Sequence, residues 1–369
     1  MKRRKKSEGY IKFNKERKSW IGRIRFEGRE KYFSGKTSAI VQKKMFDFRI
    51  AKESGLDVTR ESSIAELTVK FLEIKARTTV PKTLSGYENS INIHILPFLK
   101  NVKVTKVNVD KLNQYVDNLL SAGRTPATVN RAIAVLNQVM TLAMKLLWIS
   151  DNPVAYIDPL KHDKKEINPF SKDELNLFLD CAVDDPYYSL WLVKAMSGCR
   201  LGELVALTWN DVNFETGVID INKSYDDRFG LGTTKSKNSK RRITLNYDCL
   251  KALKEHQSTQ LEQQLSLGRY WNNIGLVFPS STGSYSHSSN LRNRSFNVIQ
   301  KEAGLTGRTP HALRHTFASL MLSSGKPVLK VSKFLGHKDM AITMRTYAHY
   351  IPENETETLV DDFSKLLNS

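Results

Sequence analysis

Three basic or potentially basic side chains stand close together in the sequence RTPHALRHTFA. Spacings of three and four residues place His311, Arg314 and His315 side by side at the first turn of a predicted helix. Pro310 favours a helix start here, which directs the positive end of the helix dipole to the same place. A zinc protease site is the least favoured reading, because Ala312 stands where the H-E-x-x-H pattern has its carboxylate. Guanidinium and imidazole groups together suit a phosphate best, ahead of a purely structural role.

Three further segments carry basic or phenolic side chains. Arg200 lies in MSGCRLGELVALTW, at a glycine-flanked turn between two apolar helices, and Glu203 follows one turn later. The segment TTKSKNSKRRITL holds five basic and no acidic residues between the predicted strands VIDIN and RRITL. That pattern predicts a β-hairpin with a basic tip that reaches into a groove. His337 and Tyr347 follow in FLGHKDMAITMRTYAHY.

These residue types favour metal-free chemistry on a phosphate. A free phenol has a pKa of about 10, so Tyr347 needs neighbouring positive charge or a base, which two arginines and His311 supply. A phosphorane-like transition state gains negative charge, and fixed cationic donors stabilise it. The sequence shows no dense carboxylate cluster of the kind that holds two metal ions, and we expect neither a metal nor a cofactor.

The whole series resembles the tyrosine recombinase family, whose best-known members are phage and transposon integrases. The resemblance rests on GCRLGEL, the lysine-rich hairpin, HALRHTFA, LGHKD and TYAHY, in that order, and covers residues 171–350. It implies that Arg200 and Arg314 hold the scissile phosphate and that His311 assists proton transfer. It also implies that His337 donates a further hydrogen bond and that Tyr347 attacks, forming an O-(3′-phospho-DNA)-tyrosine intermediate.

Two of the implied roles have competitors in the sequence. The resemblance assigns Lys235 as the acid that protonates the leaving 5′ oxygen, but Lys237 and Lys240 lie on the same hairpin tip. Tyr350 follows Tyr347 by three residues and is the competing nucleophile, although the TYAH motif favours Tyr347. One of the two tyrosines is therefore expected to be structural.

The composition predicts a polyanionic partner. Among 369 residues, Lys and Arg outnumber Asp and Glu by 57 to 38, giving a net charge of +19. Residues 1–50 hold 17 of the basic and 5 of the acidic side chains. Such asymmetry is typical of nucleic-acid binding. Three widely spaced cysteines indicate a reducing compartment, and the lack of any long apolar run excludes a membrane span, so we expect a cytoplasmic protein acting on DNA in a bacterial cell.

The predicted fold is mainly α-helical with small β-sheets, an α+β multidomain architecture. We expect an arm-site DNA-binding domain at residues 1–56, a core-site DNA-binding domain at 60–157 and a catalytic domain at 165–369. In the first domain, apolar Trp20 and Ile24 alternate with Arg23 and Arg25, which predicts a small three-stranded sheet with an arginine face. A helix over residues 38–52 would cover the apolar face.

The sequence of the second domain predicts a helical bundle. Amphipathic patterns predict helices over residues 64–74 and 109–120, another over 82–94 that ends near Pro97, and one from Pro126 capped by Thr125. A linker is expected over residues 151–168, before the capping box SKDE. The acidic tail after residue 351 carries an apolar helical stripe, and the sequence leaves open whether this tail helix packs on its own domain or on a neighbouring protomer.

The expected function is site-specific recombination that integrates or excises a mobile element. A type IB topoisomerase and a DNA-binding regulator with a vestigial site are the alternatives. The separate basic N-terminal segment favours recombination, since integrases bridge distant sites with it. The resemblance implies double-stranded DNA attachment sites of core and arm type, a homotetramer on DNA, and a DNA-bending accessory protein and an excisionase as further partners.

Overall fold

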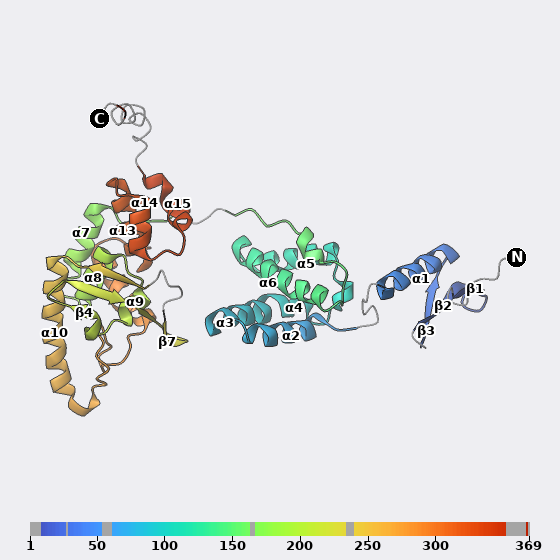
Figure 1. The fold of residues 1–369 in the computed structure, drawn as a ribbon, viewed down its shortest axis with the longest axis horizontal. Helices are drawn as coiled ribbons and strands as arrows, with labels where there is room; N and C mark the ends of the chain where they lie inside the picture. Colours follow the sequence, from blue (N-terminus) through green and yellow to red (C-terminus); the bar gives the residue numbers. More distant parts are fainter. Residues whose placement is uncertain are drawn as a thin grey trace. The chain divides into compact units, whose positions relative to one another are not determined.

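A computed structural model describes residues 9–26, 29–53, 61–162, 167–233, 240–351 and 367. The chain divides into two compact units, Met1–Lys164 and Lys165–Ser369. Helices predominate and the sheets are small and antiparallel (Figure 1), as the sequence predicts. Within the described ranges, no helix is long and apolar enough to cross a membrane.

A three-stranded antiparallel sheet and one helix begin the first unit. The strands β1 (Tyr10–Asn14), β2 (Ser19–Phe26) and β3 (Arg29–Gly35) lie in that order. Helix α1 (Ser38–Glu53) packs on the sheet, and its side chains bury Ile24 of β2. Arg25 is exposed on the other face of the strand, so the predicted alternation is confirmed.

The helices of the first unit form a bundle around its own apolar core. They are α2 (Ile64–Ala76), α3 (Pro81–Ser90), α4 (Leu96–Leu99), α5 (Val109–Ser121) and α6 (Pro126–Lys145), with a π-helical turn at Ile91–Ile95 and 3₁₀ turns at Val104–Lys106 and Pro153–Tyr156. Residues from all five α-helices meet in one core. The Thr125 side chain caps α6 by accepting from the amide of Thr128, as predicted.

Two boundaries in this bundle differ from the expectation. The helix expected over residues 82–94 begins at Pro81, and its helical turns pass through Pro97 to end at Leu99, because the π-helical turn precedes the proline and Pro97 falls in the first turn of α4. The expected linker also starts too early. Asn152 donates to Asn137 of α6 and Val154 is buried in the bundle core, so this part of the segment belongs to the bundle.

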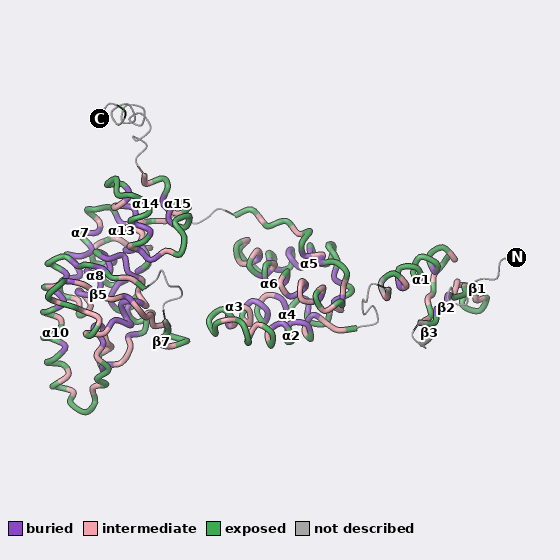
Figure 2. The backbone as a smooth tube through the Cα atoms, viewed as in Figure 1, coloured by how far each residue is buried: buried purple, intermediate pink, exposed green. Residues whose placement is uncertain are grey.

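The second unit is built around a buried central helix. Its helices are α7 (Lys172–Cys181), α8 (Tyr188–Ser197), α9 (Leu201–Val205), α10 (Tyr247–Leu267), α11 (Ser288–Leu291), α12 (Asn297–Glu302), α13 (His311–Ser323), α14 (Val328–Leu335) and α15 (Met340–Tyr347). Short 3₁₀ turns lie at Trp209–Asp211, Gly268–Tyr270 and Ala348–Tyr350, and a π-helical turn lies at Arg292–Phe296. Buried backbone runs through α8 in Figure 2, where Trp191 and Val193 are fully buried. The predicted capping box opens α7.

Two small sheets lie beside these helices. Strands β4 (Val212–Asn213), β5 (Val218–Ile221) and β8 (Arg241–Thr244) form one, and β6 (Lys223–Asp226) and β7 (Gly230–Thr233) form the other. The predicted strands VIDIN and RRITL do pair through β5 and β8, but the expected direct hairpin between them is wrong. The hairpin β6–β7 is inserted there, so the lysine-rich segment follows β7. Lys235 and Lys237 lie outside the described residues.

Candidate active site

Helix α13 begins at His311, as the sequence predicts, and it buries the guanidinium of Arg314. Arg314 is 1% exposed and donates to the carbonyl oxygens of Gly198 at 2.8 Å and Leu335 at 2.6 Å. No described carboxylate forms an ion pair with it. Burial, followed by the charge of Arg200, lowers the pKa of Arg314 to about 10, so it remains a cation at neutral pH.

A tight turn brings Arg200 to the same place. Helix α8 ends at Gly198, whose φ of 60° is left-handed, and Arg200 is the N-cap of α9. A Cβ at Gly198 would lie 2.8 Å from Cδ2 of Leu335 and 3.0 Å from Cδ1 of Phe317, so only glycine fits this turn without a shift of its neighbours. The Arg200 side chain is 39% exposed, which leaves it accessible to an anion.

Glu203 fixes the arginines of this site. Its carboxylate accepts from Arg200 at 2.8 Å and from Arg241 of β8 at 2.9 Å. Burial alone would raise the pKa of Glu203, but the hydrogen bond and charge of Arg241, with the contacts of Arg200, lower it to about 2. The carboxylate is therefore ionised and orients both guanidinium groups.

A lysine lies beneath the turn. Lys194 of α8 is completely buried, and its Nζ atom donates to the carbonyl oxygen of Cys199 at 2.7 Å. Burial lowers its pKa to about 7, and the charges of Arg314 and Arg200 act in the same direction. Lys194 and His311 also line a cleft of about 450 Å³ beside this cluster.

Tyr347, at the end of α15, meets His315. The Oη atom of the phenol lies 2.5 Å from Nδ1 of His315, and the tyrosine is 2% exposed. Burial raises the pKa of Tyr347 to about 12 although the charge of Arg314 opposes this effect. In the free protein the effect of burial on this pKa therefore outweighs that of the neighbouring cation. Tyr350 lies in the following 3₁₀ turn, Ala348–Tyr350, rather than in α15.

The two predicted histidines, His311 and His337, lie near the same arginines. His337 follows the C-cap of α14, and its Nδ1 atom lies 2.7 Å from the hydroxyl of Thr343. Burial, with Arg314 and Arg200, lowers the pKa of His337 to about 4. Burial of the imidazole ring lowers the pKa of His311 as well, and His315 and Lys194 act in the same direction. Part of the residue is nevertheless exposed at the surface. Both rings are neutral at neutral pH.

The cluster carries more positive than negative charge. Arg200 and Arg241 share the carboxylate of Glu203, and Arg314 forms no ion pair with a described carboxylate. Buried cations without matching carboxylates are costly unless an anion joins them. The arrangement therefore suits an anion with several oxygens, such as a phosphodiester. Across the described ranges, no group of three or more His, Cys, Asp or Glu residues is placed to hold a metal ion.

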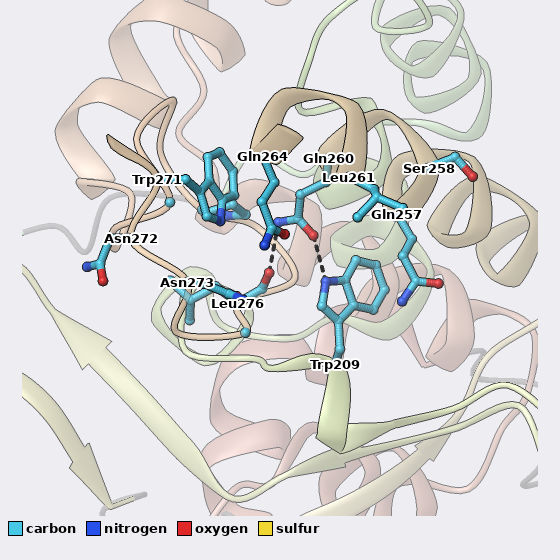
Figure 3. Close-up of a pocket in the computed structure, with 13 residues that line it drawn as sticks. Trp209, Gln257, Ser258, Gln260, Leu261, Gln264, Trp271, Asn272, Asn273 and Leu276 are labelled. Atoms are coloured by element: carbon cyan, nitrogen blue, oxygen red, sulfur yellow. Dashed lines mark hydrogen bonds between the residues drawn. The ribbon is translucent and has the colours of Figure 1, made fainter. Parts of the chain in front are cut away.

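A second cavity, of about 310 Å³, lies between α10 and the loop that follows it. Figure 3 shows Gln260 in this cavity, where it accepts from the indole of Trp209 at 2.6 Å and donates to the carbonyl of Leu276 at 2.9 Å. No titratable side chain lines the cavity. These contacts fasten α10 to the rest of the unit and provide no chemistry.

The structure brings together five of the six predicted side chains: Arg200, His311, Arg314, His337 and Tyr347. The sixth, Lys235, lies outside the described residues. Sequence reasoning missed Lys194, although a lysine within the apolar run YSLWLVKAMS was an available signal. It also missed Arg241, which no local pattern distinguishes from its neighbour Arg242.

Comparison with known proteins identifies the family. The model of the phage integrase family matches residues 169–353, and the N-terminal SAM-like domain of phage integrases matches residues 63–120. The chain belongs to the phage integrase family. The predicted tyrosine recombinase class, which cleaves and rejoins DNA in site-specific recombination, is thereby confirmed.

Curated members of this family resemble the chain over most of its length. A tyrosine recombinase XerC-like protein of Caldanaerobacter subterraneus is 28% identical over 364 residues, which cover 90% of this chain and 92% of that protein. The ICEBs1 integrase of Bacillus subtilis is 24% identical, and the match covers 76% of this chain and 78% of that protein. An integrase of Streptomyces ambofaciens is 25% identical, with 98% and 97% covered.

Solved integrases share the fold. The Tn1549 transposon integrase in complex with transposon right end DNA gives a TM-score of 0.69 at 18% identity. The match covers 83% of this chain and 100% of that chain. The lambda integrase in a tetramer bound to a Holliday junction gives 0.61 at 18% identity, covering 96% and 99%. The mainly helical multidomain architecture of this integrase-family chain therefore has close parallels.

Proposed function

We propose that this phage integrase family protein integrates or excises a mobile DNA element, with Tyr347 as the nucleophile. The observation that carries the residue assignment is the burial of Arg314, a cation without a described carboxylate partner, next to Arg200 and Tyr347. A scissile phosphate would supply the missing negative charge. Two of the five N–H groups of Arg314 bind carbonyls, which leaves donors for phosphate oxygens.

The other side chains complete the reaction. Arg200 and Arg314 hold the non-bridging oxygens, His337 donates a further hydrogen bond, and His311 assists proton transfer from the side of the cleft. Tyr347 forms a bond to phosphorus while the bond to the 5′ oxygen breaks. Lys235 protonates that 5′ oxygen, with Lys240 and Lys237 as the alternatives. Reversal by a 5′ hydroxyl of another strand rejoins the DNA and frees the tyrosine.

The DNA partners follow from the domain division. Residues 60–157 would hold the core-type site and residues 1–56 the arm-type site, where the exposed Arg25 lies on the sheet face opposite α1. Four copies would hold two DNA sites, with a DNA-bending protein and an excisionase as accessory partners in the bacterial cytoplasm. The tail helix after residue 351 would pack on an adjacent protomer. Residue 367, the one described position of this tail, is exposed.

A suicide substrate nicked near the crossover tests this function. A covalent protein–DNA adduct is expected, followed by joining between two different duplexes. An absence of adduct would favour the DNA-binding regulator instead. Adduct with relaxation of supercoiled DNA, but without joining between duplexes, would favour a type IB topoisomerase.

A further inference from the structure

The hydrogen bond between His315 and Tyr347 joins two elements that are distant in sequence. Nδ1 of His315, on α13, lies 2.5 Å from Oη of Tyr347, on α15, and the two rings are tilted at a centroid distance of 5.6 Å. Burial, followed by Arg314 and Lys194, lowers the pKa of His315 to about 4, so the ring is neutral at neutral pH. A neutral imidazole with its proton on Nε2 accepts at Nδ1. In that tautomer, the phenol donates its proton along this bond.

His311 is placed differently. Its ring meets the His315 ring edge to face, at 85° and a centroid distance of 4.7 Å, and it lines the cleft together with Lys194 and Thr309. Among the hydrogen bonds of the described residues, the phenol oxygen bonds to His315 and not to His311. Thus His315 faces the nucleophile, whereas His311 faces the cleft.

We infer that His315 is the general base for Tyr347, a catalytic role that deepens the proposed function and rests on it. In cleavage, the Oη–H bond breaks and the proton moves to Nδ1 of His315. The P–Oη bond forms, the P–O5′ bond breaks, and the 5′ oxygen takes a separate proton from the general acid. In rejoining, the 5′ hydroxyl gives its proton to the conjugate base of that acid and the P–O5′ bond forms. The P–Oη bond breaks, and the proton on Nδ1 returns to Oη.

The surroundings explain why this base works only with DNA in place. The positive charges of Arg314 and Lys194 disfavour the protonated imidazole in the free protein. A bound phosphodiester adds a negative charge beside them, which offsets their effect and makes His315 a stronger base. The buried phenol therefore stays protonated until substrate arrives.

A simpler role for the same hydrogen bond is restraint of Tyr347 in a resting position. The two roles predict opposite effects for His315→Ala in single-turnover cleavage of a nicked suicide substrate. Loss of a general base slows adduct formation, typically by a factor on the order of 10² to 10⁴. Loss of a mere restraint leaves the rate unchanged or increases it, and either result would overturn the inference.

A substrate with a modified leaving group distinguishes the general base from the general acid. A 5′-bridging phosphorothiolate leaves without protonation, so it should restore cleavage by Lys235→Ala but not by His315→Ala. Added imidazole should partly rescue His315→Ala. Restoration of His315→Ala by the phosphorothiolate would contradict the inference, because it would assign His315 to the leaving group. His349→Ala, which removes an exposed histidine two residues after Tyr347, should cleave as the wild type does.

A reaction that bypasses the tyrosine tests whether the variant is intact. DNA with a 3′-p-nitrophenyl phosphate end can be joined to a 5′ hydroxyl without Tyr347 and without an acid for the departing phenolate. His315→Ala should join this substrate near the wild-type rate; equal loss of both reactions would contradict a role specific to the tyrosine. Failure of the wild-type protein to form adduct would instead reject the proposed function itself.

Discussion

Arg241 donates to Glu203 at 2.9 Å, and both side chains are almost completely buried. The bond connects β8, which follows the lysine-rich segment, to α9, whose N-cap is Arg200. The C-terminal end of the segment that contains Lys235 is therefore fixed relative to Arg200, which we propose holds the scissile phosphate. This contact therefore stabilises the second unit and also sets the position of Arg200.

Replacement of Glu203 by Gln should destabilise the protein. It leaves Arg241 and Arg200 without their carboxylate, and breaking a buried ion pair costs about 3 to 5 kcal/mol. Urea unfolding at neutral pH measures this loss. Asp220→Asn is the matched control, because it breaks the exposed ion pair of Arg242 on the same strand, which is worth about 1 kcal/mol or less. Equal effects of the two variants would show that burial does not strengthen the Glu203 contact.

Loss of Arg200 or Arg314, the two arginines proposed to hold the phosphate, should impair cleavage more than binding. Arg200→Ala and Arg314→Ala should each slow single-turnover cleavage by a factor on the order of 10² or more, as removal of one preorganised donor does. Arg314→Ala also leaves two carbonyl partners unpaired, so its rate must be referred to the folded fraction. Arg242→Ala, an exposed arginine of β8, should cleave normally. A folded Arg314→Ala protein that cleaves at the wild-type rate would refute the phosphate assignment.

The buried Lys194 predicts a pH dependence of stability. Folding lowers its pKa to about 7, whereas an unfolded lysine keeps its proton to about pH 10. Between these pH values the unfolded state binds more protons, so the Lys194 contribution to the free energy of unfolding increases with pH and is least favourable below pH 7. Lys194→Met should flatten this increase between pH 7 and pH 9.5, and the exposed Lys251→Met should not. Parallel pH profiles for wild type and Lys194→Met would contradict the lowered pKa of the buried lysine.

Local features of the site follow from the sequence. The start of α13 at His311 depends on neighbouring residues, and so do the turn before Arg200 and the capping box of α7. Such features involve residues within a few positions of each other, where spacing and capping rules apply. The domain family follows as well, because the motifs keep their order along the chain.

Long-range contacts did not follow from the sequence. The partners of Arg241 and Tyr347 lie 38 and 32 residues away, and only the tertiary packing of β8 on α9 and of α13 on α15 brings them together. The raised pKa of the phenol did not follow either, since Arg314 lowers this pKa but the depth of burial, which the sequence does not give, raises it more. The inserted hairpin β6–β7 was missed because its strands, KSYD and GLGT, each hold a single apolar side chain, too few for an alternating pattern.

The basic N-terminal segment should contribute to binding at arm-type DNA. Deletion of residues 1–55 removes its excess positive charge, so we expect normal cleavage at a core site but impaired integration. Binding to long attachment DNA should depend less steeply on salt, by roughly 0.9 in the log–log slope for each phosphate that the shortened protein no longer neutralises. On DNA with a core site alone, the slope should not change. An unchanged slope on the long DNA would remove the arm-binding assignment.

The most direct test of the account is covalent adduct formation by Tyr347→Phe on a nicked suicide substrate in the presence of EDTA. The substitution removes only the attacking oxygen and its hydrogen bond to His315. We predict that wild type and Tyr350→Phe form the adduct, and that Tyr347→Phe binds the same DNA nearly as well but forms none. Adduct formation by Tyr347→Phe, together with its loss in Tyr350→Phe, would contradict the assignment of Tyr347 as the nucleophile.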